Sequence, residues 1–137
     1  MSLIESVIAM AIAATALASA TPAILESREQ YLLSAAAQDV STALYAAKVH
    51  AILEARDCRF RADSTTSYVV ECQRTAGPVW TEVERRSLAA GLTLSANNRP
   101  EFHRRGNVSP TATISVWNAR GRTLKVIVNA NGRIRTQ

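Results

Sequence analysis

The sequence predicts an α+β protein, in which one long N-terminal helix packs on a C-terminal antiparallel β-sheet head. Three observations predict this class: an uncharged run near the N-terminus, a helical period that continues to about Arg56, and short strand-like runs beyond Asp57. We expect three segments along the 137 residues. These are a hydrophobic transmembrane or filament-core helix at 1–25, an amphipathic helix at 26–56 and a β-rich head with a basic C-terminal segment at 57–137.

The first segment is apolar but contains one acid, Glu5, just before its uncharged run. No charged residue lies between Glu5 and Glu26, and the twenty residues at 6–25 match the length that a helix needs to cross hydrocarbon. No Lys or Arg precedes this run, although a secretory signal peptide requires a basic start. Most side chains are small, which lets helices approach closely in lipid. Pro22 removes one backbone donor and favours a kink or local melting.

The N-terminal residues resemble a known family. The run MSLIE from Met1 to Glu5, with the uncharged stretch and Pro22 after it, resembles the mature N-terminus of type IV pilins and pseudopilins. Ser2 departs from the threonine that this family usually carries. The alternative is a simple single-pass anchor that contains a chance acid.

The resemblance carries expectations about processing and place. It implies that prepilin peptidase acts on a precursor, that this sequence is already processed, and that residue 1 is N-methylated. Met1, Glu5 and Pro22 would serve assembly with other pilin subunits through the N-terminal helix. The protein would cross the inner membrane once, with its head in the periplasm, and later join a pilus fibre.

A helical pattern continues from Pro22 to about Arg56. Apolar residues recur at steps of three or four, which predicts a helix with one covered face. This stripe comprises Leu33, Ala36, Ala37, Val40, Leu44, Ala47, Ala51 and Ile52. His50 lies near the stripe and is expected to be a partly covered structural residue.

Beyond Asp57 the period becomes that of strands. Short β-branched or alternating runs lie at 68–72, 79–83, 92–94, 113–117 and 124–128, and a last run lies at 133–135. The Asn131-Gly132 pair predicts a tight turn before that last run. The turns at 118–121 and 129–132 echo each other in sequence.

Two cysteines are too few for a disulfide-rich scaffold or a four-thiolate zinc site. Cys58 and Cys72 are expected to form a disulfide, since the resemblance places the head outside the cytoplasm, where oxidation is possible. The bond would close a loop of about fifteen residues and stabilise the head by roughly 3 kcal/mol. Two free thiols are the alternative. The sequence predicts no metal site and no cofactor.

The sequence contains no motif typical of a catalytic site. The chain has no Gly-rich phosphate loop and no HExxH or CxxC spacing. His50 and His103 stand in no recognisable relation to a Cys or Ser. Glu82 and Glu84 are expected to share one face of a strand at a solvated edge. The sequence therefore predicts no catalytic residue and no enzyme.

Positive charge is concentrated in the last quarter of the chain. The whole sequence has 16 Lys+Arg and 11 Asp+Glu, which gives +5. Residues 101–137 contain seven bases and one acid, so their balance is 7 − 1 = +6, and residues 1–100 carry the remaining −1. A basic surface of this kind favours a polyanionic partner.

The C-terminal half is similar to the head of GspH/FimT-type minor pilins, with a strand, an Xaa-Gly-Arg turn, another strand and a terminal Asn-Gly-Arg-Ile-Arg. A Gly-Arg-Xaa-Arg motif is tied to DNA binding in natural transformation in some FimT-type pilins, and here it stands at 132–135. The resemblance implies a minor pilin of a type IV pilus, in the fibre or at its tip, that binds double-stranded DNA without sequence preference. The residues expected to contribute are Gly132, Arg133, Arg135, Arg120, Arg122, Lys125, Arg104 and Arg105.

Other interpretations of the basic segment remain open. It can be a solvated edge, or it can face anionic lipid or an acidic neighbouring subunit. The protein would then be a structural minor pseudopilin of a type II secretion system with no nucleic-acid role, and a major pilin is a further alternative. Trp117 is the only Trp or Tyr near the basic tail, so base stacking is expected to contribute little.

Overall fold

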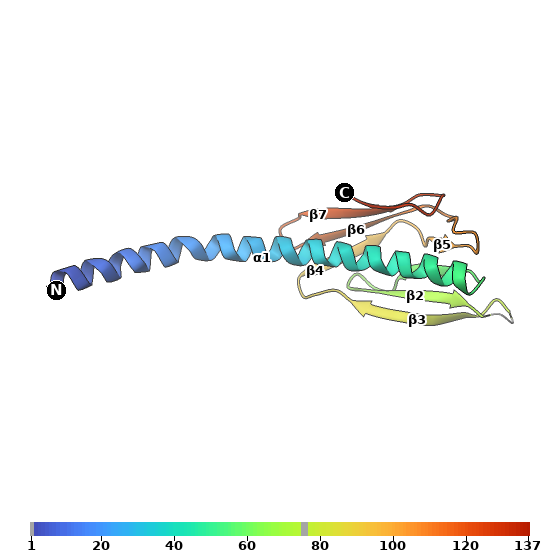
Figure 1. Ribbon diagram of the computed structural model, residues 1–137, viewed down its shortest axis with the longest axis horizontal. Coiled ribbons are helices and arrows are strands. Elements are labelled where there is room, and N and C mark those ends of the chain that lie inside the picture. The colour runs from blue at the N-terminus through green and yellow to red at the C-terminus, as the bar shows by residue number, and fades with distance from the viewer. Residues whose placement is uncertain (1, 75–76) are drawn as a thin grey trace. The chain divides into compact units, whose positions relative to one another are not determined.

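The computed structural model describes residues 2–74 and 77–137. Met1, which the sequence predicts to take part in assembly, lies outside the described residues. The chain forms two compact units, the first ending at Leu32 and the second covering Leu33–Gln137, and each is described by itself. One helix, α1 (Leu3–Leu53), begins in the first unit and ends in the second (Figure 1).

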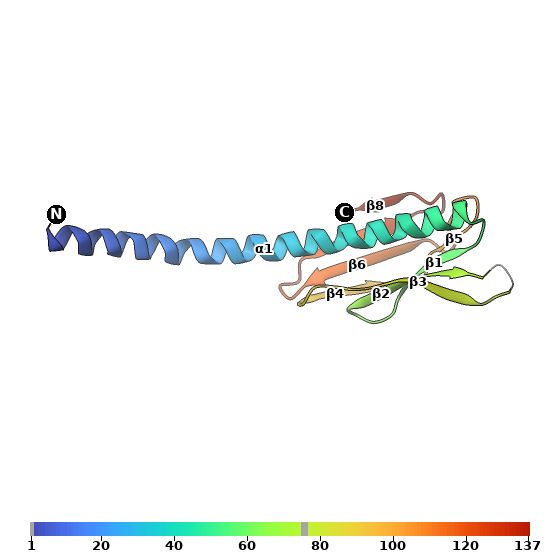
Figure 2. The same ribbon diagram turned by 60° about the horizontal axis from the view of Figure 1, so that its bottom comes forward.

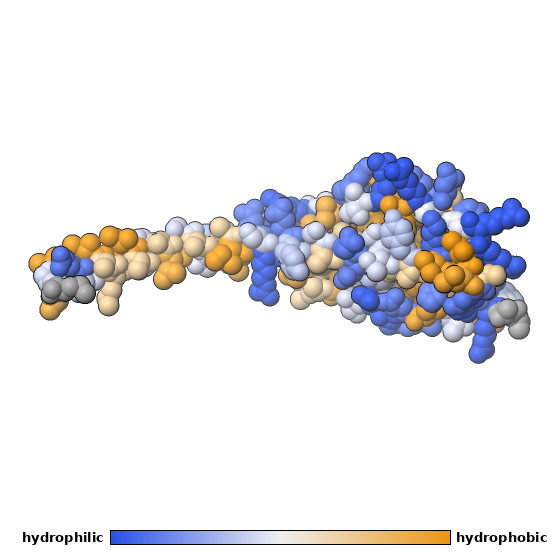
Figure 3. Space-filling view, viewed as in Figure 1, coloured by the Kyte–Doolittle hydropathy of each residue, from blue (hydrophilic) through white to orange (hydrophobic). Residues whose placement is uncertain are grey.

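The first unit is a single stretch of helix with an exposed apolar surface. Between Leu3 and Leu25 its large apolar side chains are at least half exposed, and they are drawn in orange shades along this helix in Figure 3. Among the described residues, α1 is the one helix whose length and composition are sufficient to cross a membrane. It continues through Pro22 without interruption, so the local melting expected there is not present.

A capping box begins the helix. The Ser2 backbone N–H donates to Glu5 Oε2 at 3.1 Å, and the Glu5 backbone N–H donates to Ser2 Oγ at 3.4 Å. This reciprocal pair satisfies two of the free donors that every helix N-terminus leaves. The Glu5 carboxylate therefore has a partner within its own chain.

In the second unit, the α1 residues from Leu33 onward lie across both β-sheets (Figures 1 and 2). The predicted apolar stripe is buried along its length, with Val40, Leu44, Ala47 and Ala51 completely covered. Ile52 is the exception, because 46% of its surface is exposed, so its assignment to the stripe was wrong.

The helix ends at Leu53, three residues before the predicted end at Arg56. The Arg56 N–H donates to the Ala51 carbonyl oxygen at 3.2 Å, and Ala55 adopts the left-handed conformation with φ of 50°. This is the geometry of a Schellman motif. Glycine usually occupies the left-handed position, so an alanine there gave no signal of the helix end in the sequence.

The head contains two four-stranded sheets, in which every pairing is antiparallel. The first sheet has the order β3-β2-β1-β5 and the second the order β4-β6-β7-β8 (Figures 1 and 2). The strands are β1 (Cys58–Ala62), β2 (Ser67–Gln73), β3 (Trp80–Ser87), β4 (Leu92–Ala96), β5 (Glu101–Phe102), β6 (Ala112–Asn118), β7 (Thr123–Val128) and β8 (Ile134–Thr136). The predicted helix-plus-antiparallel-head architecture is thus confirmed.

The sequence did not predict β1 and β5. β1 alternates buried Cys58 and Phe60 with Arg59 and Arg61, but it lacks β-branched residues. No strand was expected between Asp57 and Tyr68. The segment between the cysteines is instead a hairpin of β1 and β2.

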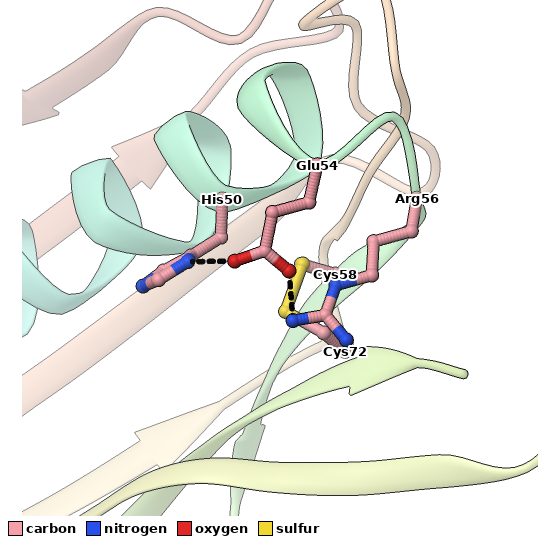
Figure 4. The surroundings of a disulfide bond; sticks show 5 residues. All are labelled: His50, Glu54, Arg56, Cys58 and Cys72. Atoms are coloured by element: carbon pink, nitrogen blue, oxygen red, sulfur yellow. Dashed lines mark hydrogen bonds and ion pairs between the residues drawn. A yellow bond between two sulfur atoms is a disulfide. The ribbon is translucent and has the colours of Figure 1, made fainter. Parts of the chain in front are cut away.

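A disulfide joins Cys58 and Cys72, as expected. The two residues lie directly opposite each other on β1 and β2, and both are fully buried. Figure 4 shows the bond beside the end of α1, where Glu54 lies between His50 and Arg56. The hydrogen bond from His50 holds the pKa of Glu54 below its usual value.

Reduction of the full-length protein in detergent should lower the melting temperature of the head. The disulfide removes roughly 3 kcal/mol of chain entropy from the unfolded state, which corresponds to a fall on the order of 10 °C. Circular dichroism melts of reduced and alkylated protein measure it, and protein treated with the alkylating agent alone is the control. Two free thiols in the mass spectrum of unreduced protein would contradict the disulfide.

Candidate functional site

The outer face of the first sheet carries a network of paired charges. Glu71, which is almost buried, accepts from Arg59 Nε at 2.7 Å and from Arg61 Nη2 at 3.0 Å. Burial acts to raise the pKa of Glu71, but the hydrogen bonds from the two arginines outweigh it and hold the pKa below its usual value. The Arg59 guanidinium also lies 4.1 Å from the centroid of the Trp80 ring.

The network continues to β3. Asp63 pairs with Arg61 and Arg85, and Arg85 Nη2 also lies 2.8 Å from Glu82 Oε2. Hydrogen bonds from Arg85 and Arg61 lower the pKa of Asp63. Three arginines and three carboxylates thus neutralise one another on this face.

Glu82 and Glu84 were expected to share one face of a strand, but they point to opposite faces of β3. Glu71 pairs with Glu82, whereas its neighbour Val70 pairs with Glu84, so Val83 is an extra residue at a β-bulge. Because Val70 and Glu71 point to opposite sides of β2, their partners do so as well. Glu84 forms a separate pair with Arg86.

The predicted nucleic-acid residues belong mainly to the second sheet and its turns. The turns at 118–122 and 129–133 have the same hydrogen bonds, since Gly121 N–H donates to the Asn118 carbonyl at 3.0 Å and Gly132 N–H to the Asn129 carbonyl at 2.9 Å. Both glycines have positive φ, of 80° and 73°. Each hairpin therefore has a three-residue loop with a left-handed glycine, rather than the two-residue turn that Asn-Gly favours.

The structure divides the predicted residues between the two ends of this sheet. Arg120 and Arg122 lie at the β6–β7 turn and Arg133 at the β7–β8 turn, so the six residues of β7 separate them by about 20 Å. Lys125 and Arg135 lie between, on the outer face of the sheet. Arg135 pairs with Ile127, two residues from Lys125 on the same face.

The turn that carries Arg104 and Arg105 contacts the turn that carries Arg133. Arg104 and Arg105 lie in the turn closed by the Gly106 N–H, which donates to the His103 carbonyl at 2.8 Å. A Cβ placed on Gly132 would collide with the carbonyl oxygen of Gly106, so the 103–106 and 129–133 turns are in direct contact.

A lysine of α1 holds this contact in place. Lys48 Nζ donates to the Gly132 carbonyl at 3.0 Å, and a Cβ on Gly106 would lie only 3.2 Å from Ile52 Cδ1. Gly132 is itself buried. The close approach that its missing side chain permits is therefore to Gly106 of the same chain.

The cations of this region lack carboxylate partners. Within the described ranges 2–74 and 77–137, no ion pair involves Arg104, Arg105, Lys125, Arg133 or Arg135, and all five side chains are exposed. In Figure 3, strongly hydrophilic side chains project from the side of the head that carries β7 and the C-terminus. Together these five residues are called the basic surface below.

An open pocket of about 600 Å³ lies beside the other turn. Trp117, Asn118 and Gly121 line it from the second sheet, and Thr66 and Gly91 line it from the neighbouring loops. The Asn118 side-chain oxygen accepts from the backbone N–H groups of Arg120 and Arg122, which fixes the shape of this turn.

Sequence reasoning did not single out a cluster of three residues whose side chains could together hold a metal ion. Asp57, Glu101 and His103 each offer one ligand atom, and these atoms all lie within 4.8 Å of one another. Asp57 follows α1, whereas the other two belong to β5 and its following turn. No local motif marks the cluster, because only the pairing of β1 with β5 brings the segments together.

Solved structures of known proteins share this fold. The type IV minor pilin FimU of Pseudomonas aeruginosa matches with a TM-score of 0.65 and 18% identity, over 80% of this chain and 90% of its own. The minor pseudopilin EpsH of the Vibrio cholerae type 2 secretion system matches with a TM-score of 0.67 and 19% identity, over 77% and 95%. GspH of E. coli matches with a TM-score of 0.62 and 12% identity, over 81% and 87%.

These similarities identify the fold as type IV pilin-like, the fold of minor pilins and minor pseudopilins, which confirms the resemblance noted in the sequence. No protein-family model matches the sequence, and no curated protein matches it significantly.

The two turn glycines provide a matched pair of substitutions. Gly121→Ala should lower the free energy of unfolding by about 1 kcal/mol, the cost of a left-handed alanine, because a Cβ there meets nothing within 4 Å. Gly132→Ala should lower it by about 2–4 kcal/mol, since the added Cβ also displaces the Gly106 turn. Urea denaturation of the full-length variants in detergent measures both. Equal losses would show that the contact between the turns contributes nothing.

Proposed function

We propose that this protein is a minor subunit of a type IV pilus whose head binds double-stranded DNA without sequence preference. Its apolar N-terminal helix anchors it in the inner membrane, with the head in the periplasm, until it joins other pilin subunits in the fibre or at its tip. Prepilin peptidase would act on its precursor. This role is structural and involves no catalysis.

The observation that carries the DNA proposal is the contrast between two sets of cations. On the first sheet, Arg59, Arg61 and Arg85 are neutralised by carboxylates. The five residues of the basic surface have no such partner in the described part of the chain. Unpaired guanidinium groups suit phosphate oxygens, since each presents several donors in a fixed plane.

The spacing of the terminal arginines also suits a phosphate backbone. Arg133 and Arg135 are two residues apart at the edge of the second sheet, so their side chains leave the same face about 7 Å apart. Each phosphate of one DNA strand rises about 3.4 Å along the axis while the strand winds around it, so adjacent phosphates are about 7 Å apart, which matches this separation. Gly132 is buried, so in this proposal it positions Arg133 and does not touch DNA.

A structural subunit of a type II secretion pseudopilus is the second candidate. The minor pseudopilin EpsH matches this chain as well as the minor pilin FimU does, with TM-scores of 0.67 and 0.65. In that case the basic surface would contact solvent or an acidic neighbouring subunit. DNA binding separates the two candidates.

Replacement of Glu5 tests assembly. We expect Glu5→Ala to remain in the membrane but to be absent from sheared fibres, because an apolar helix bundle needs the carboxylate paired with a cation such as the terminal amine of an adjacent subunit. Ser2→Ala is the matched control, since it removes the capping hydroxyl and keeps the carboxylate. Fibres that incorporate Glu5→Ala normally would exclude an assembly role for Glu5.

Fluorescence anisotropy with a short DNA duplex tests binding by the full-length protein in detergent. Binding should be micromolar or weaker, within the usual non-specific range, with each phosphate contact adding about −0.9 to the slope of log affinity against log salt. Arg133→Gln with Arg135→Gln should weaken binding and flatten that slope by up to about two.

Arg85→Gln with Arg86→Gln is the matched control for charge. It removes the same formal charge from exposed arginines that already have carboxylate partners. It should leave the slope unchanged. If wild-type protein does not bind, or if both double variants behave alike, the DNA proposal is wrong and the structural pseudopilin takes its place.

A further inference from the structure

We propose that Asp57, Glu101 and His103 form a binding site for a divalent transition-metal ion, of which Zn²⁺ is the representative. The proposal is independent of DNA binding. The site lies in the head, between the end of α1 and the turn that carries Arg104 and Arg105.

The ligand atoms are close to the arrangement that a zinc ion requires. His103 Nδ1 lies 3.3 Å from Asp57 Oδ1. Two ligands at about 2.0–2.1 Å from a tetrahedral Zn²⁺ are themselves roughly 3.4 Å apart, so this pair already has the required separation. The Glu101 carboxylate is within 4.8 Å of both, a distance that a side-chain rotation can shorten.

The backbone that holds the three ligands is fixed from the other side of the sheet. Asp57 precedes Cys58, and Glu101 and His103 flank Phe102, which lies opposite Cys58 in the β1–β5 pairing. Cys58 and Phe102 are fully buried, and Cys58 is held by the disulfide. All three ligands therefore point to the outer face of the sheet from a rigid base.

Hydrogen bonds fix the two flanking segments. The Asp57 carbonyl accepts from the Gln73 N–H at 2.8 Å, and the His103 N–H donates to the Asn107 carbonyl at 2.9 Å. The side chains of Asp57 and His103 are 27% and 33% exposed, so an ion can reach them from solvent. A fourth coordination position remains for water.

The donor set favours a transition metal over calcium or magnesium. Two carboxylates and a neutral imidazole carry a formal charge of −2, which suits a divalent cation. Imidazole is a ligand for zinc, copper, iron and nickel, whereas calcium and magnesium prefer oxygen alone. Arg59, which lies opposite Glu101, pairs with Glu71, and Arg56, which precedes Asp57, pairs with Glu54, so neither occupies the site.

The competing explanation is a simple ion pair between Asp57 and a protonated His103. It accounts for the 3.3 Å contact but requires no third group. The chain offers a natural comparison, because its second histidine, His50, makes a contact of 2.9 Å with Glu54 and has no further carboxylate in a ligand cluster among the described residues.

Zinc titration of the full-length protein in detergent, with no polyhistidine tag, tests the site. Isothermal titration calorimetry should show one Zn²⁺ per chain, and saturating Zn²⁺ should raise the melting temperature of the head by several degrees. His103→Ala and Asp57→Asn should each weaken binding at least about tenfold and lose the thermal shift. His50→Ala should keep both, and Mg²⁺ at the same concentration should produce no shift.

Circular dichroism of the metal-free variants establishes that each remains folded. The proposal is overturned if wild-type protein shows no binding, if His103→Ala binds as wild type, if the shift is lost with His50→Ala, or if Mg²⁺ acts as Zn²⁺ does. The first of these results would leave the Asp57–His103 contact as an ion pair.

Discussion

The head depends on one covered surface, the apolar stripe of α1 between Leu33 and Ala51. The two sheets have separate hydrogen-bonded ladders, so the ladders alone do not unite them. The helix contacts both: Asp39 lies 4.0 Å from Arg86 of the first sheet, and Lys48 binds the carbonyl of Gly132 beside the second. Alanines make up much of the stripe, and their small size allows backbone to approach closely.

Packing near the end of α1 also positions part of the basic surface. Lys48 and Ile52 contact the glycines of the 103–106 and 129–133 turns, and these turns carry three of the exposed arginines. The positions of the basic side chains thus follow from packing at the end of the helix.

Much of the fold could be predicted because its signals are local. The uncharged run, the stripe and the strands at 113–117 and 124–128 are visible as periodic patterns. The missed features are set by tertiary pairing. β5 has only two residues and exists through its pairing with β1, and the bulge at Val83 depends on the register with β2. The end of α1 was missed because an alanine occupies the left-handed position.

How far each site could be predicted also depends on whether its residues are close together in the sequence or are brought together by strand pairing. Arg133 and Arg135 are two residues apart in the chain, so a shared face follows from strand geometry alone. Which cations lack partners could not be predicted, since the pairing of Arg61 with Glu71 depends on the β1–β2 hairpin. The Asp57, Glu101 and His103 cluster is still more distant in sequence. Without the β1–β5 register, it contains no spacing that a motif search would recognise.

The distribution of charge is the strongest physical argument that the basic surface has a partner. The network on the first sheet combines the exposed pair of Arg85 with Glu82, which contributes little to stability, with the buried Glu71, which needs its two arginines. Its effect is to leave that face neutral, while the positive balance of the chain remains on the second sheet and its turns. Unpaired cations at neighbouring turns repel one another. In the proposed function, a bound polyanion would relieve this repulsion, and the release of its counterions would favour binding further.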